Sequence, residues 1–274
     1  MDNSYTRLRA FRIEGGGLSA SYSVDMEFSL IGGRFCDSIK AKIIEEMQIA
    51  GCDSIDLLHI PSWESVCCQP DELQELLQKL EPSDIEIPSY QPKDETGKAS
   101  RKVIMDYCAL SPISELIELT PKTIRKYSND DVKRQVLLPS KTYETPTNND
   151  IVSQFFKGRF SVFNTGYLKS EQIVEIICKR DLKKVDVMLL NDGIGSNSFI
   201  WGRFINKFKP AILIDNQTNE YYKLGNVNLE TMGISTKRTE SGDVLITSGV
   251  RRNDSEIDAT IDNCFGGMQY KTEL

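Results

Sequence analysis

The order of strand-like and helical segments is the feature that most constrains how this chain can fold. Apolar runs bounded by glycine and polar residues indicate strands in both halves of the chain, and helical periodicity separates many of them. Glycine turns at residues 15–17, 32–33 and 157–158 punctuate neighbouring strands. This order favours sheets covered by helices. The predicted strands are residues 8–13, 18–23, 24–31, 55–60, 83–88, 150–156, 159–165, 185–190, 211–215 and 244–248.

Two helices are predicted in the first half from the spacing of apolar side chains. Ile39, Ile43 and Met47 recur on one face of a helix over residues 37–50, which a glycine ends. Pro70 opens the second helix, in which four leucines follow at helical spacing.

The second half of the chain carries two further predicted helices. Ser170 caps one of them, and the other runs over residues 199–208 until Pro210 stops it. Between the halves, residues 91–102 are polar and charged and predict a surface loop. Residues 111–133 favour no single structure.

Composition limits the class of partner and compartment. The net charge of −7 and a pI near 5.0 argue against bulk binding of nucleic acid or of an anionic membrane surface by this chain alone. Seven cysteines at irregular spacing indicate reduced thiols and not a disulfide framework. No leader is evident, and no apolar run approaches the roughly 18 residues that span a bilayer. We therefore expect a cytoplasmic protein without membrane contact.

Seven stretches stand in a fixed order along the chain: residues 28–33 (FSLIGG), 52–58 (CDSIDLL), 148–153 (NNDIVS), 158–167 (GRFSVFNTGY), 185–196, 208–214 (FKPAILI) and 241–247 (SGDVLIT). Together they resemble the metallo-β-lactamase family, and they are most similar to the hydrolase domain appended to the competence DNA-uptake channel. The resemblance implies an α/β (α+β) fold, an αββα four-layer sandwich over residues 1–250, followed by a polar C-terminal tail over residues 251–274.

The family binds one or two metal ions through clustered histidines and aspartates, and the metal activates a water for hydrolysis. Carrying its ligand positions over residue by residue places them on side chains that mostly cannot hold a divalent cation. The resemblance therefore implies that the metal ligands are lost, and we expect no metal and no other cofactor. These vestigial site positions are Ile31, Ser62, Glu64, Val66, Cys67, Tyr167 and Asp192.

His59 is the single histidine of the chain and stands on the apolar strand before the former ligand loop. We interpret it as a packed or hydrogen-bonded histidine in preference to a surviving ligand. Three other chemistries stay open. Cys67 and Cys68 with Glu64 and Asp192 would form a replacement zinc site, a cysteine would act as nucleophile with His59, or Glu64 and Asp192 would act as paired carboxylates. Structural thiols and solvated acids are the alternatives to all three.

Three aromatic residues stand near the former ligand positions: Trp63, Tyr90 and Tyr167. Their side chains either fill the former cleft or present an aromatic contact surface to a partner. The filling of the core is the favoured interpretation.

We predict from this loss of ligands that the chain is not an enzyme. It would be a non-catalytic pseudo-hydrolase that serves as a protein-interaction or scaffold subunit of a complex, with another protein subunit as partner and bacterial anti-phage defence as a setting. The alternatives are a diverged hydrolase with an atypical site at Glu64, Cys67, Asp192 and His59, or a sensor that binds an anion in the old cleft through Arg34 or Lys169 and residues 193–196.

Overall fold

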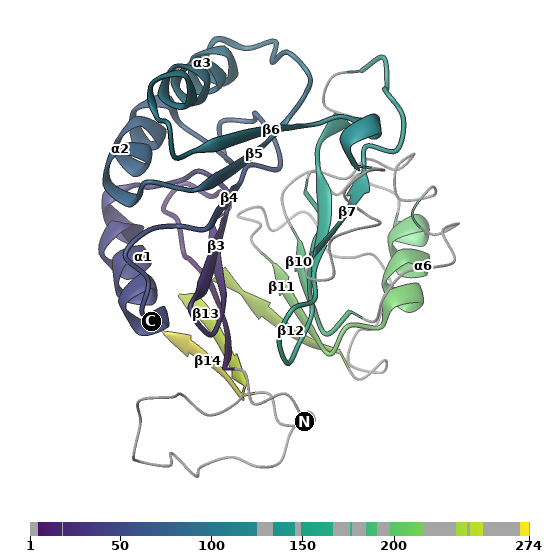
Figure 1. Cartoon of the computed structure of the whole chain (residues 1–274). Coiled ribbons are helices and arrows are strands. Elements are labelled where there is room, and N and C mark those ends of the chain that lie inside the picture. The colour runs from purple at the N-terminus through teal and green to yellow at the C-terminus, as the bar shows by residue number, and fades with distance from the viewer. Residues whose placement is uncertain are drawn as a thin grey trace.

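Two β-sheets face each other, and helices cover the outer face of each sheet (Figure 1). The structure is a computed structural model that describes residues 5–17, 19–124, 134–145, 149–166, 176, 185–190, 198–215, 234–239, 242–248 and 269–273. Within these residues the strands form one sheet of eight and one sheet of six. The layers confirm the predicted αββα sandwich.

The eight-stranded sheet joins an antiparallel half to a parallel half. Its order is β14-β13-β1-β2-β3-β4-β5-β6, in which the pairs from β14 to β3 are antiparallel and those from β3 to β6 are parallel. The strands predicted from the first half of the chain are confirmed with shifted ends. The bounds of these predicted strands are β1 Thr6–Ala10, β2 Ala20–Val24, β3 Glu27–Ile31, β4 Leu57–His59 and β5 Asp84–Pro88, with the predicted β13 Asp243–Ser248 from the second half. The sequence did not predict the remaining two strands, β6 Glu115–Leu119 and β14 Gln269–Glu273.

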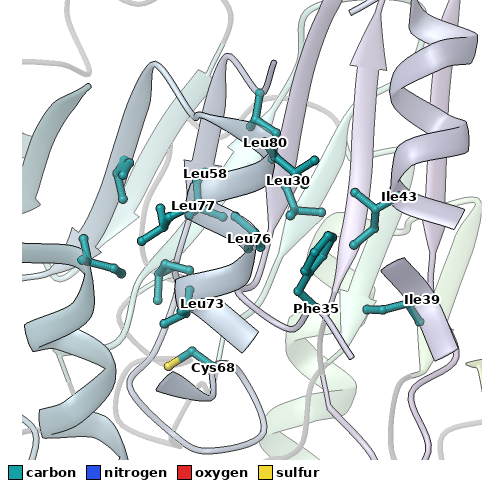
Figure 2. Close-up of a cluster of buried hydrophobic side chains, with 14 of the residues drawn as sticks. Leu30, Phe35, Ile39, Ile43, Leu58, Cys68, Leu73, Leu76, Leu77 and Leu80 are labelled. Atoms are coloured by element: carbon teal, nitrogen blue, oxygen red, sulfur yellow. The ribbon is translucent and has the colours of Figure 1, made fainter. Parts of the chain in front are cut away.

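Helices α1 (Asp37–Ala50), α2 (Pro70–Leu80) and α3 (Glu95–Leu110) pack on one face of this sheet. As predicted, α1 ends at Gly51, whose φ of 75° suits a residue without a Cβ, and α2 begins at proline. Figure 2 shows the leucines of α2 against side chains of β3 and β4. Each such buried side chain contributes roughly 1.5–3 kcal/mol relative to an exposed one.

Helix α3 corrects the prediction of a surface loop over residues 91–102. Asp94 Oδ1 accepts a hydrogen bond from the Gly97 N–H at 2.8 Å, which caps the helix. Gly97 and Ser100 are buried, and a Cβ on Gly97 would lie 2.7 Å from the Cβ of Pro92. The loop prediction is wrong because small residues pack this helix against the core and leave little apolar periodicity in the sequence.

The six-stranded sheet has the order β12-β11-β10-β9-β8-β7, and α6 (Ser198–Phe208) covers its outer face. The predicted strands and the predicted helix over residues 199–208 are confirmed here. The helix predicted after Ser170 lies outside the described residues except for Ile176. The strand bounds are β7 Arg134–Leu138, β8 Val152–Phe155, β9 Val162–Asn164, β10 Val187–Leu190, β11 Ile212–Asp215 and β12 Ser235–Arg238.

Strand alternation divides the interior into three apolar layers. Leu58 faces the helices on the outer side of its sheet, whereas the preceding Leu57 faces the second sheet. In the same way, Met188 packs in the cluster that contains Phe204 and Phe208 of α6, and Leu189 faces the first sheet. A continuous inter-sheet core results, and the site described below lies in this layer.

Two segments differ from their sequence interpretation. Residues 111–133, which favoured no single structure, contain β6 and a helical turn over residues 121–124. Residues 269–273, placed in the polar tail, form strand β14 beside β13. Backbone pairing at a sheet edge needs no apolar side chains, so composition alone did not indicate this strand. Among the described helices, none is long and apolar enough to cross a membrane.

Candidate active site

A hydrogen-bonded group of three polar side chains lies between the two sheets. His59 Nδ1 is 2.8 Å from Glu86 Oε2, and His59 Nε2 is 3.0 Å from Ser153 Oγ. All three residues are fully buried. We call Glu86, His59 and Ser153 the histidine relay.

Strand geometry brings the relay together. His59 is the last residue of β4 and is paired with Glu86 of the neighbouring parallel strand β5. The residues on either side of Glu86 face the helices, so its carboxylate faces the second sheet. Ser153 approaches from β8 on that sheet, one pleat from Phe155, whose ring meets the His59 ring edge-on at 5.7 Å. The relay therefore sits near the carboxyl ends of parallel strands, where open α/β sheets bind ligands.

Arg134 fixes the ionisation of the relay. Its guanidinium nitrogen lies 2.7 Å from Glu86 Oε1. Burial by itself would raise the pKa of Glu86, but the hydrogen bond from His59 and the charge of Arg134 outweigh burial and lower this pKa. An ionised Glu86 accepts a hydrogen bond from Nδ1–H, which assigns the Nε2 lone pair of a neutral His59 as acceptor for the Ser153 hydroxyl.

A second buried polar contact lies between the sheets. The Tyr90 hydroxyl donates to Asp150 Oδ1 at 2.6 Å. Burial and the neighbouring carboxylate raise the pKa of Tyr90, so the phenol stays protonated at neutral pH. The same hydroxyl lies 3.4 Å from the backbone nitrogen of Trp63, which donates to it. Tyr90 thus joins the loop that contains Trp63 to the segment that leads into β8.

Those sequence-predicted ligand positions that the structure describes do not form a metal cluster. Ile31 ends β3 and pairs with His59, and Ser62 is buried. Glu64 and Val66 are partly exposed. Cys67 packs in the inter-sheet core. The other two positions, Tyr167 and Asp192, lie outside the described residues.

The neighbouring cysteines face different layers. Cys67 belongs to the inter-sheet core, whereas Cys68 belongs to the cluster under the helices. Burial raises the pKa of Cys68 to about 12, so its thiol is protonated at neutral pH. Two side chains on opposite sides of the backbone cannot share one tetrahedral ion, which argues against the replacement zinc site.

The described residues do not fit a metal ion. No three histidine, cysteine, aspartate or glutamate side chains within them converge as ligands. Both ring nitrogens of His59 already lie within hydrogen-bond distance of Glu86 and Ser153. The apolar side chains of Ile31 and Val66 and the hydroxyl of Ser62, at three of the predicted ligand positions, are poor ligands for a divalent cation.

The residues named in the other sequence-based hypotheses lie in different parts of the molecule. His59 is hydrogen-bonded, as interpreted, and its nearest nucleophile is Ser153 and not a cysteine. Trp63 is 1% exposed and packs in the cluster under the helices, while Tyr90 is partly buried. Arg34, proposed for anion binding, binds Glu72 at 2.9 and 3.0 Å and Gly16 O at 3.2 Å. Lys169 and residues 193–196 lie outside the described residues.

Sequence reasoning missed Glu86, Ser153 and Arg134. A carboxylate between two isoleucines in a strand was the available signal for Glu86, because strand alternation sets it opposite the helix-covered face. Ser153 had no signal, since its partner His59 is 94 residues away in the sequence.

No family model and no curated protein sequence match this chain. Solved structures do match it at low identity. The metallo-β-lactamase fold protein YhfI from Bacillus subtilis is 10% identical with a TM-score of 0.51, over 86% of this chain and 96% of that one. Tm1679, a metal-dependent hydrolase of the β-lactamase superfamily, is 10% identical with a TM-score of 0.51, over 85% and 95%. Igni18, a metallo hydrolase from Ignicoccus hospitalis, is 11% identical with a TM-score of 0.50, over 88% and 98%.

These likenesses show that the chain has the metallo-β-lactamase fold. They also contradict our prediction that it is not an enzyme. The solved structures that share its fold include proteins described as hydrolases, and the relay supplies polar groups that the ligand-based prediction did not consider. The closer similarity to the competence-channel domain stays a prediction.

Proposed function

We propose that this protein is a diverged hydrolase with an atypical site, in which His59 acts as the general acid–base group and Glu86 holds and orients its imidazole. The observation that carries the proposal is the hydrogen-bonded sequence from Glu86 through His59 to the Ser153 hydroxyl. An imidazole that is hydrogen-bonded to a carboxylate on one side and to a hydroxyl on the other can take a proton from an attacking group and give it to a leaving group. Hydrolysis needs both transfers.

The setting of His59 supports this role. The carboxylate of Glu86 holds Nδ1–H, so the ring keeps one tautomer and one orientation. Because the site is buried, a charge that develops on the ring is stabilised by Glu86 more strongly than it would be in water. Arg134 keeps that carboxylate ionised.

The metal-dependent chemistry named for Tm1679 and Igni18 does not carry over onto the described residues, which do not fit a metal. The proposal therefore uses His59 and Glu86 alone. Since the relay is fully buried, a substrate reaches it only after a local movement that opens the inter-sheet layer. We expect turnover to be limited by that movement.

The test is a hydrolysis panel on the purified full chain in buffer containing EDTA. p-Nitrophenyl acetate represents carboxylic esters, and bis(p-nitrophenyl) phosphate represents phosphodiesters. We expect release of nitrophenol from at least one of them, with a loss of about 10²–10⁴-fold in His59→Asn. Lys102→Ala is the control, since its exposed pair with Asp106 lies on the surface of α3.

Two results would contradict the proposal. One is the absence of hydrolysis above the buffer rate for every probe. The other is a His59→Asn protein that is folded, by circular dichroism, and hydrolyses the probes at the rate of the unchanged protein. The predicted protein partner and the defence setting stay predictions, for which recovery of a stoichiometric partner from the native host is the measurement.

A further inference from the structure

We propose that Ser153 is the nucleophile of this site and that its substrates are neutral carboxylic esters. The inference rests on the proposed hydrolase function and deepens it. Three strands supply the three groups of the relay: β8 gives the hydroxyl, β4 the imidazole and β5 the carboxylate.

The connectivity of the relay is that of a serine–histidine–acid triad. The hydroxyl is bonded to Nε2 at 3.0 Å, and the carboxylate is bonded to Nδ1 at 2.8 Å. Both distances lie in the range for a nucleophile with its base and for a base with its orienting group. Each ring nitrogen has its own partner: Nε2 faces the hydroxyl and Nδ1 faces the carboxylate, as in such a triad.

Asn164 lies beside Ser153 and carries a side-chain amide donor. It is directly opposite Ser153 in the antiparallel pair of β8 and β9, so both side chains lie on the same face of the sheet. It is fully buried, and its Oδ1 accepts from the Gly166 N–H at 3.3 Å, which orients the carboxamide. We assign its Nδ2 as the donor to the developing oxyanion.

The charge of the site favours a neutral acyl group over a phosphodiester. Arg134 is paired with Glu86 at 2.7 Å, so its positive charge is balanced within the site. Three further described neighbours of the relay are apolar: Ile31 is paired with His59, Val136 is paired with Ser153, and Phe155 contacts the imidazole ring. An anionic phosphodiester would lose its hydration here without a compensating cation.

The reaction has two steps, acylation of Ser153 and hydrolysis of the acyl group. Ser153 Oγ bonds to the ester carbonyl carbon while its proton passes to His59 Nε2, and the carbon–alkoxide bond then breaks as the alkoxide takes that proton and leaves as an alcohol. Water next attacks the acyl carbon and gives a proton to Nε2. The acyl–Oγ bond breaks, Oγ recovers the proton, and the carboxylic acid leaves. Glu86 stays ionised and bonded to Nδ1–H throughout.

The experiment compares Ser153→Ala with a matched control, Ser100→Ala. Both serines are fully buried, but Ser100 lies on α3 in the layer under the helices. We expect Ser153→Ala to lower p-nitrophenyl acetate hydrolysis by about 10³-fold or more, whereas Ser100→Ala stays within about twofold. Thermal unfolding of both variants establishes that each is folded at the assay temperature.

A fluorophosphonate probe gives a second, independent measurement. The Ser153 oxygen displaces fluoride from the phosphorus, and peptide mass spectrometry then finds the adduct on residues that include Ser153. We expect this adduct in the unchanged protein and in Ser100→Ala, and its loss in Ser153→Ala and His59→Asn. If Ser153→Ala does not fold, labelling of the unchanged protein still decides the question.

The outcomes separate the inference from the proposed function. Hydrolysis that depends on His59 but persists in a folded Ser153→Ala protein overturns the serine nucleophile and leaves the acid–base proposal standing. An adduct at another residue, or none after prolonged incubation, likewise overturns it. Hydrolysis of the phosphodiester in preference to the ester overturns the substrate class. The absence of all hydrolysis contradicts the proposed function itself.

Discussion

Two buried charged clusters in this protein make different use of the same kinds of side chain. The first, which we call the arginine cluster, consists of Arg7, Arg9, Glu46 and Asp243 and joins α1 to strands β1 and β13. Arg9 Nε lies 2.9 Å from Asp243 Oδ2, and Arg9 Nη1 lies 3.0 Å from Glu46 Oε1. The second is the histidine relay with Arg134.

The difference lies in where each network ends. In the arginine cluster, the guanidinium groups of Arg7 and Arg9 pair with the carboxylates of two acidic residues, so two cations balance two anions. In the relay, the carboxylate leads through an imidazole to a hydroxyl. Burial and hydrogen bonding are therefore insufficient to indicate a reactive site. A reactive site also needs a base that is hydrogen-bonded to a nucleophile and can take its proton.

Substitution of Arg9 should have the largest effect on stability. Arg9→Ala leaves Asp243 and Glu46 buried with fewer positive partners, and loss of one member of a buried ion pair costs about 3–5 kcal/mol. We expect urea denaturation to show a fall of this size in the free energy of unfolding. Ester hydrolysis per folded molecule should be unchanged. If hydrolysis per folded molecule fell together with the free energy of unfolding, the two clusters would no longer differ in function.

Substitution of Glu86 should cost less stability but more activity. Glu86→Gln keeps the shape of the side chain and removes the charge that faces His59 and Arg134, for which we expect a loss of about 1–3 kcal/mol. Hydrolysis should fall by about 10²-fold or more, because the tautomer of His59 is no longer fixed. Stability comes from denaturation, and activity from the ester assay. Full activity in a destabilised protein would assign Glu86 a structural role alone.

The part of the stability that Glu86 contributes, and that acid removes, should be no larger than the loss of stability in Glu86→Gln. The folded-state pKa of Glu86 is lowered from the ordinary value of 4.5, so its contribution is complete above about pH 4.5 and is lost as the pH falls through the folded-state pKa. Comparing denaturation curves of the unchanged protein and Glu86→Gln between pH 7 and pH 3 isolates this part. Parallel pH profiles for the two proteins would contradict it.

Removal of the Ser153 hydroxyl should change stability by only about 1 kcal/mol, the usual contribution of one hydrogen bond. Together with the large expected loss of activity, this small change is the sharpest contrast with the arginine cluster. Differential scanning calorimetry of Ser153→Ala and Ser100→Ala measures it. A loss above about 3 kcal/mol would indicate that the hydroxyl mainly holds the sheets together.

The smallest effect is expected for an exposed pair. Lys102→Ala removes the contact with Asp106, in which both side chains are more than half exposed, and such pairs contribute about 0.3–0.5 kcal/mol at helical spacing. The difference in the free energy of unfolding between the unchanged protein and Lys102→Ala should depend only weakly on salt concentration. A cost similar to that of Arg9→Ala would mean that burial does not distinguish the charged clusters.

Local patterns in the sequence predicted most of the fold. The leucines of α2 and the isoleucines of α1 recur at the helical period, and apolar runs predicted ten strands of the two sheets. Strands β6, β7, β12 and β14 were not predicted. Helix α3 was missed since its packing uses Gly97 and Ser100, which carry no periodic signal. The relay was missed for a different reason. Its members are 27 and 94 residues apart, and only the pairing of β4 with β5 and the stacking of the sheets bring them together.

The adjacent cysteines have a consequence for how unfolding can be observed. Cys67 and Cys68 are consecutive, yet each thiol is shielded by a separate layer of side chains. A thiol reagent added during slow unfolding would therefore reach them at different times if the layers part in succession. The order of alkylation, read by mass spectrometry on a single peptide, reports whether the helices leave their sheet before the sheets leave each other.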